Sequence, residues 1–420
     1  MIAAALLLPL GQPHPEASAA YARWMASTLT YGSLSTISTR TDGSTVGDAF
    51  GNPYSFADVG GVPYLYASDL DASMTDLFVG ATASSRGTLA LSAASLLHPN
   101  GSSIVDACEI GAGYGDPENP PCARLTLSGV FSKVSSNATE YAAAYSALVA
   151  RHPFISTLPD THDFYVAKMS LDGIWLIDMY GGAAIVEPAS YFKAAASTDL
   201  ANAALAKAAA KPAAAAARAA AAARAAAAAV QAGPPPFIKK AETARWMVST
   251  LTYGFLATTS TRTDGSTAGD AFGNPYGIAD VAGVPYVYGT DLDASFTDLF
   301  VGSAASPRCT IALSEAQLGG TGLPALPKAC VIAPGASGDP ENPPCARLVL
   351  SGTMAKVAAG SDEETAAKAA LFAKHPAYAQ YPGGHGFYVA KLNLDNLWLI
   401  NMYGGAAVIS PDDYFKATPK

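Results

Sequence analysis

Alternation of apolar and polar residues predicts a series of β-strands, and most of them occur twice along the chain. The segment ARLTLSGVFSKV at 123–134 alternates almost strictly, which is typical of a half-buried strand. ADVGGVPYLY at 57–66 and TLALSA at 88–93 are predicted as further strands. FYVAKMSLDGIWLIDMYGG at 164–182 is predicted to form a hairpin or a long bent strand pair. The pattern therefore favours a mainly β protein.

Helical periodicity is confined to a few short segments. The segment beginning at Pro15 and the segment 137–153, which ends at a His-Pro pair, are amphipathic over three to four turns, as is 242–253 in the second half. SDLDASMTDLFVG at 68–80 is predicted to be a short helix or turn capped by Ser68 or Asp69. With few helices and many strands, the chain is predicted to form a small antiparallel barrel with helices outside it.

The barrel is predicted to occur twice. The block Thr39–Tyr66 recurs without a gap as Thr261–Tyr288, 222 positions later. Such similarity at so long a period indicates a duplicated domain rather than a solenoid. We assign 1–19 as a signal segment, 20–193 as the first domain, 194–236 as a linker and 237–420 as the second domain.

The linker is rich in alanine, and its Ala-rich segment lies between Pro212 and Gly233. Alanine is the best helix former, and the run between Pro212 and Gly233 has room for a helix of about 30 Å. A helical spacer between two domains that pair with each other is one interpretation, and a neutral expansion of alanine codons is the other.

Composition and charge narrow the classes of partner. The formal net charge is −9, and no Lys/Arg cluster is interleaved with aromatic residues, so nucleic acid is disfavoured. The apolar start Met1–Leu10 followed by Ala17-Ser18-Ala19 indicates a secretory signal that lacks its basic segment, with a frayed tail as the alternative. No apolar run reaches the roughly 18–20 residues of a membrane span.

The cysteines favour an oxidising compartment. Four of the five bracket the same Pro/Gly-rich loop in each half, as Cys108 with Cys122 and Cys330 with Cys345. No Cys/His spacing suggests zinc, and one disulfide per half, worth roughly 3 kcal/mol on the chain-entropy model, is favoured over buried thiols. Cys309 has no counterpart and is predicted to be a free buried thiol.

The ordered motifs RWM, LTYG, GVPY, PPCARL, LSG, HP, FYVAK and YGG, present in both halves, resemble the CREG family. These are secreted or lysosomal glycoproteins with the split-barrel fold of the pyridoxamine-phosphate-oxidase-like superfamily, which includes many FMN-binding members. The resemblance implies that the two halves form a covalent pseudo-dimer, since family members are homodimers. It also implies the disulfides Cys108–Cys122 and Cys330–Cys345.

Glycosylation is a further implication of the resemblance. Asn137-Ala-Thr139 is an N-glycosylation sequon placed where family members carry one, between a strand and the helix that follows it. Asn100-Gly-Ser102 is a second sequon, in a predicted loop. The second half has no sequon at the place that corresponds to Asn137.

Some relatives in the superfamily bind FMN or haem at the interface between subunits. Flavin-binding relatives usually have a basic residue after the second main strand, where this chain has Asp69 and Asp71, repeated as Asp291 and Asp293. Carboxylates there disfavour a phosphate. We therefore predict that no FMN binds, and that the insertion 41–54, repeated at 263–276, fills the ancestral pocket.

Haem or another cofactor is the alternative. The candidate cofactor-binding residues are His162, His385, Lys168, Lys391, Thr36 and Ser38. A neutral imidazole is a common axial ligand to haem iron, whereas a histidine at the start of a strand more often bonds a backbone carbonyl. The lysines suit an anion or, more commonly, extend along a barrel rim. His152 and His375 end helices, where a cation favours the helix dipole.

No hydrolytic site is predicted. The chain has no GxSxG motif, and the pairs Asp42/Asp48 and Asp264/Asp270 lie in turn-rich sequence, where Asp is favoured for backbone hydrogen bonding rather than for calcium or catalysis. The sequence therefore favours a secreted or endolysosomal, non-catalytic glycoprotein that binds a protein receptor. The alternatives are an FMN- or haem-dependent oxidoreductase with its site between the two halves, and a structural duplication without a ligand.

Overall fold

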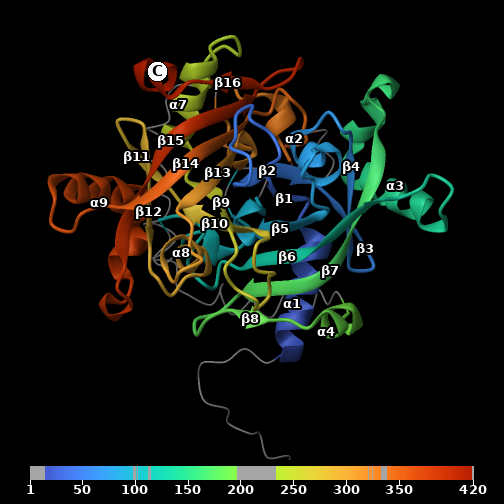
Figure 1. Cartoon of the computed structure of the whole chain (residues 1–420), viewed down its shortest axis with the longest axis horizontal. Coiled ribbons are helices and arrows are strands. Elements are labelled where there is room, and N and C mark those ends of the chain that lie inside the picture. The colour runs from blue at the N-terminus through green and yellow to red at the C-terminus, as the bar shows by residue number, and fades with distance from the viewer. Residues whose placement is uncertain are drawn as a thin grey trace, which may run out of the picture.

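The computed structural model describes residues 15–418 except for 98–100, 102, 112–114, 196–232, 320, 324 and 333–337 (Figure 1). Most of the predicted signal segment, the sequon residue Asn100 and nearly all of the predicted linker lie outside the described residues. We refer to residues 15–195 as the first copy and to residues 233–418 as the second copy.

The first copy consists of strands with short helices between them. Its helices are α1 (Pro15–Thr28), α2 (Ala72–Met74), α3 (Thr139–Arg151) and α4 (Pro188–Lys193), and a π-helical turn, η1 (Thr75–Val79), follows α2. Its strands are β1 (Tyr31–Ile37), β2 (Ala49–Ser55), β3 (Ala57–Val59), β4 (Val62–Ala67), β5 (Arg86–Ser92), β6 (Arg124–Lys133), β7 (Tyr165–Ile177) and β8 (Ala184–Ile185).

The second copy repeats this order. Its helices are α7 (Lys240–Thr250), α8 (Ala294–Phe300), α9 (Asp362–Lys374) and α10 (Pro411–Lys416). Its strands are β9 (Tyr253–Thr259), β10 (Ala271–Gly277), β11 (Ala279–Val281), β12 (Val284–Gly289), β13 (Arg308–Ser314), β14 (Arg347–Lys356), β15 (Tyr388–Ile400) and β16 (Ala407–Ile409).

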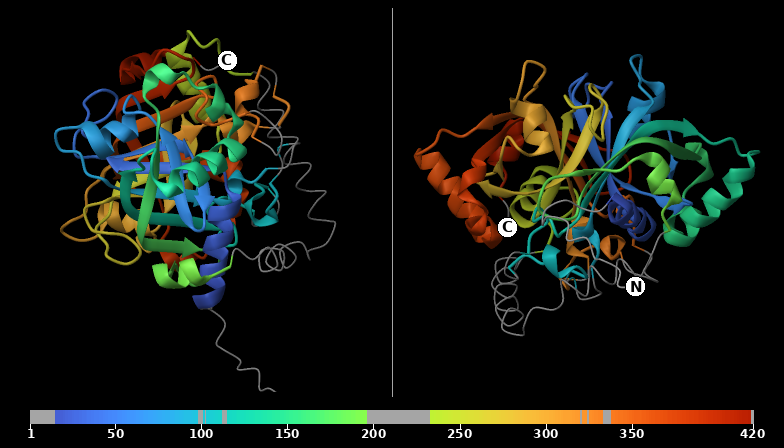
Figure 2. Two further views of the ribbon diagram at one scale, coloured as in Figure 1. Left: turned by 90° about the vertical axis from the view of Figure 1, so that its right-hand side faces the viewer. Right: turned by 90° about the horizontal axis from the view of Figure 1, so that it is seen from below.

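Each copy folds into one antiparallel sheet of eight strands that curls into a half-barrel. The strand order is β2-β1-β5-β6-β7-β4-β3 in the first copy and β10-β9-β13-β14-β15-β12-β11 in the second, with β8 and β16 attached to β7 and β15. Helices α3 and α9 lie at opposite ends of the molecule, outside the sheets (Figures 1 and 2). The prediction of two mainly β domains with outer helices is confirmed.

The segment predicted as a hairpin or strand pair is one strand with a bulge. In β7, Gly173 pairs with Ser128 and Leu171 pairs with Gly129, so Asp172 is the extra residue. Asp395 is the extra residue of β15 for the same reason. A bulge bends a strand and strengthens its twist, so one strand of 13 residues curves with the barrel and no turn is needed inside it.

The cap of the short helix differs from the prediction. Asp71, rather than Ser68 or Asp69, accepts hydrogen bonds from the backbone of Ser73 and Met74 and begins α2. Asp293 does the same for α8 through Ser295. A carboxylate satisfies amide groups that a helix leaves unpaired at its start, and the residue directly before the first turn is placed to do so.

The two copies share a hydrophobic core along β2 and β10. Strand β2 packs against β13, and β10 packs against β5. Side chains of the second copy, among them Phe255 and Trp398, belong to the same buried cluster as the first-copy core. The amide of Gly51 donates to Oγ1 of Thr310 (3.0 Å), and the amide of Gly273 donates to Oγ1 of Thr88 (3.2 Å). The copies therefore pair within the chain as a pseudo-dimer.

The structure contains the disulfides Cys108–Cys122 and Cys330–Cys345. Cys309 on β13 is a free buried thiol, and burial raises its pKa to about 12. A thiol with so high a pKa is a poor nucleophile at neutral pH. Cys309 therefore acts as a small apolar side chain in the core.

Candidate functional site between the two copies

The residues predicted to bind a cofactor do not come together. Lys168 donates from Nζ to Oε1 of Glu140 on α3 (2.6 Å), and Lys391 donates in the same way to Glu363 on α9 (2.7 Å). His162 and His385 are exposed on turns before β7 and β15. Each lysine is thus held by a carboxylate, and each histidine lies in solvent.

Thr36 and Ser38 belong to a separate buried network around Asp76. Thr36 donates from Oγ1 to Oδ2 of Asp76 (3.0 Å), and Arg40 donates to both carboxylate oxygens (3.0 and 2.9 Å). Ser38 shares a hydrogen bond with Ser44 (2.7 Å). Asp298 has matching partners in the second copy, including Thr258 and Arg262. These hydroxyl groups hold the start of the insertion in place.

The acidic segment after β4 carries its own cation. Asp69 accepts two hydrogen bonds from Nζ of Lys133 (2.8 and 2.7 Å) and one from the hydroxyl of Tyr165 (2.6 Å). Asp291 has the same partners, Lys356 and Tyr388, in the second copy. A basic residue is therefore present near this segment, but its charge is already neutralised.

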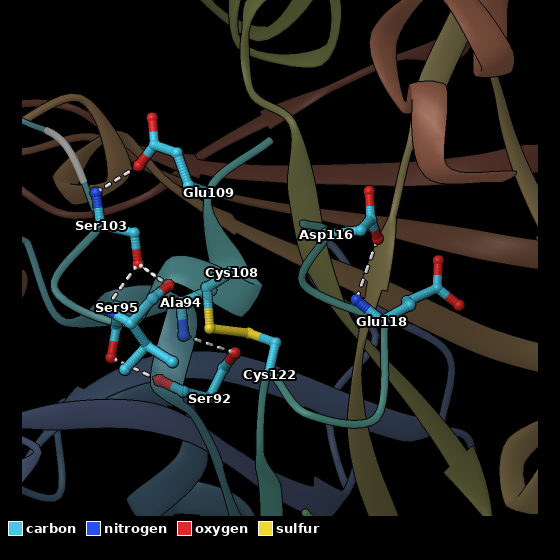
Figure 3. The surroundings of a disulfide bond; sticks show 10 residues. Ser92, Ala94, Ser95, Ser103, Cys108, Glu109, Asp116, Glu118 and Cys122 are labelled. Atoms are coloured by element: carbon cyan, nitrogen blue, oxygen red, sulfur yellow. Dashed lines mark hydrogen bonds between the residues drawn. A yellow bond between two sulfur atoms is a disulfide. The ribbon is translucent and has the colours of Figure 1, made fainter. Parts of the chain in front are cut away.

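Two short acidic arms that cross between the copies build a buried polar site. We call Asp116–Asn119 and Asp339–Asn342 the acidic arms; each has the sequence Asp-Pro-Glu-Asn and lies between the cysteines of its disulfide. Within the first arm, the amide of Glu118 donates to Oδ1 of Asp116 (2.9 Å; Figure 3). This turn presents both carboxyl groups to the other copy.

The first residue of each arm pairs with a buried histidine of the other copy. Oδ2 of Asp116 lies 2.6 Å from Nδ1 of His375, and Oδ2 of Asp339 lies 2.6 Å from Nδ1 of His152. The other ring nitrogen of His152 faces the carbonyl of Phe56 (2.9 Å). Both ring nitrogens of His152 therefore face acceptor oxygens. These histidines, predicted only to end helices, join the two copies.

The third residue of each arm binds the backbone of the other copy. Oε2 of Glu118 accepts from the amide of Gly277 (2.8 Å) and from the hydroxyl of Tyr378. Oε2 of Glu341 accepts from the amide of Ser55 (2.8 Å), whose hydroxyl donates to Asp339. The arms therefore take up amide groups at the ends of β2 and β10.

Burial changes the pKa of these acids in two directions. Burial raises the pKa of Glu118 well above its usual value, and the Asp116 carboxylate raises it further. Burial likewise raises the pKa of Glu341, against the opposing charge of Arg347. Burial alone would also raise the pKa of Asp339, but the hydrogen bond and the charge of His152 hold it below its usual value. The second arm thus combines an aspartate whose pKa is held low with a glutamate that favours its neutral form, and the glutamate of the first arm favours its neutral form as well.

A buried arginine completes each cluster. Arg124 donates from Nη1 to Oδ1 of Asn274 in the second copy (3.4 Å), and the same nitrogen lies 3.8 Å from Asp293. Arg347 donates to the side chain of Asn52 (3.3 Å) and to the carbonyl of Pro53 (3.2 Å). Both arginines follow the second cysteine by two residues, so the disulfide loop delivers the arm and the cation together.

The two clusters differ at two positions. In the second copy, Tyr378 and Tyr381 lie after His375, whereas Ile155 and Leu158 lie at the corresponding places after His152. The hydroxyl of Tyr378 donates a hydrogen bond to Glu118. The ring of Tyr378 stacks on His375, with centroids 4.9 Å apart. Glu341 has no such phenol partner among the described residues.

A further set of ion pairs connects the insertions to the bulges. Arg86 donates to the bulge residue Asp172 (2.7 Å) and also to Asp270 of the other copy (2.6 Å). Arg308 contacts Asp395 and donates to Asp48 of the other copy (2.8 Å) in the same arrangement. Asp48 and Asp270 therefore serve the pairing of the copies.

The repeated geometry matches a known family. The family profile described as "CREG, beta-barrel" matches residues 13–193 and again residues 235–416. The chain belongs to the CREG family.

Individual CREG proteins match one copy at a time. Protein CREG1 of Gallus gallus is 34% identical over 193 residues, which are 44% of this chain and 90% of that protein. Human protein CREG1 is 30% identical over 189 residues, 44% of this chain and 77% of that protein. This CREG-family chain thus carries two family domains in tandem.

Two solved structures show weaker similarity. A heme binding protein from Mycobacterium smegmatis is 23% identical, with a TM-score of 0.33, covering 44% of this chain and 63% of that chain. HutZ, a heme storage protein from Vibrio cholerae, is 12% identical, with a TM-score of 0.25, covering 37% of this chain and 88% of that chain.

Within the described part of this CREG-family chain, none of the helices combines the length and the apolar character that crossing a bilayer requires.

The repeated sequence itself contains a signal for the acidic arms. GDPENPPCAR is identical in both copies, and a His-Pro pair follows each copy of it at the end of a helix. Both loops have the same acidic residues, and each copy also has a histidine that can pair with them. This repetition is compatible with loops that bond to the other copy. Only the arrangement in space shows that Asp116 faces His375 rather than its own His152.

Proposed function

We propose that the chain is a non-catalytic CREG-like glycoprotein, secreted or endolysosomal, that acts by binding a protein receptor as a preassembled pseudo-dimer. The observation that carries this proposal is that cationic side chains of the two barrels are already paired with carboxylates. Lys133, Lys168, Lys356, Lys391 and Arg40 each have a carboxylate partner within 3.1 Å. A flavin phosphate would have to displace those carboxylates to be held, so these residues do not fit FMN.

The interface between the copies supports the same proposal. The acidic arms bond to histidines and backbone amides across the interface, so these groups are not free to hold a cofactor. The insertion 41–54 also lies on the other copy: Ser351 donates to the carbonyl of Gly43 (3.4 Å), and Phe50 packs edge-to-face on Trp398. The proposal that the insertion fills the ancestral pocket is consistent with these contacts.

The disulfides of both copies support secretion, and the first copy supports glycosylation. Two disulfides favour an oxidising compartment. Asn137 is exposed and lies two residues before α3, a helix at an outer end of the molecule (Figure 1). A glycan attached there leaves the pairing of the copies undisturbed. Loss of an endoglycosidase-sensitive mass in Asn137→Gln, but not in Asn100→Gln, would assign the glycan to Asn137.

The experiment that tests the proposal is an absorption spectrum of the protein purified from an oxidising host supplied with riboflavin and a haem precursor. We expect no flavin or Soret band, and no quenching of added FMN fluorescence. A band of near-stoichiometric height would overturn the proposal and favour the cofactor-dependent alternative. A Soret band lost in His162→Ala or His385→Ala would then identify the axial ligand.

A further inference from the structure

The second disulfide has a buried carboxyl group beside it that the first disulfide lacks. Glu315, the first residue of the 3₁₀ turn Glu315–Leu318 after β13, is 1% exposed. Its Oε2 lies 3.5 Å from Sγ of Cys330 and accepts from the amide of Ala346 (2.9 Å). Its Oε1 has no hydrogen-bond partner among the described residues. A buried carboxyl oxygen without a donor favours the protonated acid.

The first copy provides an internal comparison. Ala93 occupies the place of Glu315, and its amide donates to the carbonyl of Ala123 (2.9 Å) just as the amide of Glu315 donates to Ala346 (2.9 Å). The backbones are therefore equivalent, and the cysteines of both disulfides are buried. The carboxyl group of Glu315 is therefore one difference between the surroundings of the two disulfides.

We propose that Glu315 donates a proton to Cys330 when the Cys330–Cys345 disulfide is reduced. The class of molecule that reduces this disulfide is a dithiol. A thiolate of the reductant attacks Sγ of Cys345, forming a mixed disulfide, and the Cys330–Cys345 bond breaks with its electron pair on Cys330. Glu315 gives its proton to Cys330 and recovers one from water. The second thiol of the reductant then displaces Cys345, which takes up a proton, and the reductant leaves as a disulfide.

The surroundings leave Glu315 as the group that exchanges this proton. Tyr31 of the first copy packs in the same cluster as both cysteines, and burial raises its pKa to about 12. Lys328, two residues before Cys330, is exposed. Arg347, beside Ala346, donates to Asn52 and Pro53 instead. Burial raises the pKa of Glu315 itself to about 7, against the hydrogen bond from Ala346, so its protonation changes near neutral pH.

The test measures the two disulfides in one molecule. The full chain is reduced with dithiothreitol between pH 6 and pH 8, trapped with a maleimide, and each disulfide is quantified by peptide mass spectrometry. The ratio of the two rates cancels the ionisation of the reductant, which is common to both. We expect the ratio of Cys330–Cys345 to Cys108–Cys122 to rise about tenfold from pH 8 to pH 6, as a general acid of neutral pKa becomes protonated.

Two variants complete the test. Glu315→Gln, which keeps the acceptor for Ala346 but has no acidic proton, should give a ratio independent of pH. Ala93→Glu should confer a similar pH dependence on the reduction of Cys108–Cys122. A rate ratio that does not change with pH in the unmodified chain would overturn the proposal. Reduction of both disulfides together on global unfolding would give such a ratio and would overturn it too. If the rate ratio in Glu315→Gln kept the pH dependence of the unmodified chain, the proposal would be overturned as well. If Glu315→Gln does not fold, Ala93→Glu still tests the proposal.

Discussion

At the scale of single residues, two buried His–Asp pairs connect the two copies. The side chains of His375 and Asp116 are both 0% exposed, so each depends on the other to offset its desolvation. His152 and Asp339 form the equivalent pair at the other end of the interface. Breaking such a pair costs more than the pair itself contributes, because one partner stays buried alone.

His375→Ala should therefore lower the free energy of unfolding by about 3–5 kcal/mol, the usual cost of leaving a buried charge without its partner. Urea unfolding followed by tryptophan fluorescence measures the loss. The matched control is His385→Ala, an exposed histidine ten residues later, which should change stability by less than about 0.5 kcal/mol. Equal effects of the two substitutions would contradict the buried ion pair.

The buried glutamates predict a pH dependence of stability. The folded chain holds the protons of Glu118 and Glu341 more tightly than the unfolded chain, because burial raises both pKa values above 4.5. Their contribution is therefore complete below the unfolded pKa and is lost as pH rises from about 4.5 towards the folded pKa. Urea midpoints between pH 4.5 and pH 8 should fall with pH, and the decline should be shallower in Glu118→Gln. An equal decline in both proteins would show that Glu118 ionises freely.

At the scale of elements, the insertion after β1 combines a special backbone with a crowded contact. Gly43 and Gly47 both have positive φ, 71° and 89°. A Cβ on Gly43 would lie 2.8 Å from the side chain of Trp398 in the other copy, whereas a Cβ on Gly47 would meet nothing within 4 Å. Substitutions at the two glycines therefore distinguish the cost of backbone strain from the cost of disturbing the contact between the copies.

Gly43→Ala should be more destabilising than Gly47→Ala by about 1–3 kcal/mol, the usual cost of overpacking. Both variants share the strain of placing an L residue in the left-handed region. Thermal or urea unfolding of the two variants side by side measures the difference. If they were equally stable, the insertion would not rest on Trp398 as the structure shows.

The sequence predicted elements better than contacts. The alternating segment at 123–134 became β6, and the amphipathic segments became α1 and α3, because local periodicity reflects which face is buried. The bulge at Asp172 was not predicted, since one extra residue hardly changes the pattern. The acidic arms were missed for another reason: the partner of Asp116 lies 259 residues away, and no local signal reports such a distance.

At the scale of the whole molecule, one chain contains both sides of the interface between its two CREG domains. The copies share a core and exchange arms in both directions. The pairing therefore rests on buried groups and not on the linker alone.

Residues 13–195 and 233–420, produced as two separate chains in one cell, should therefore associate one to one. Purification through a tag on one chain, followed by size-exclusion chromatography, measures the complex. Substituting both His152 and His375 with alanine should reduce recovery of the untagged chain, because both arms lose their partners. Recovery of the tagged half alone, with intact His152 and His375, would mean that covalent connection is what holds the copies together.

The difference between Tyr378 and Ile155 has a consequence for how this protein can change over generations. In a homodimer encoded by one gene, every substitution appears on both sides of the symmetry axis, so a change that helps one site is imposed on the other. Here each site has its own codons. Tyr378 and Tyr381 arose, or were lost, at one end without altering the other. Because both domains lie in one chain, its two ends are free to acquire separate specificities.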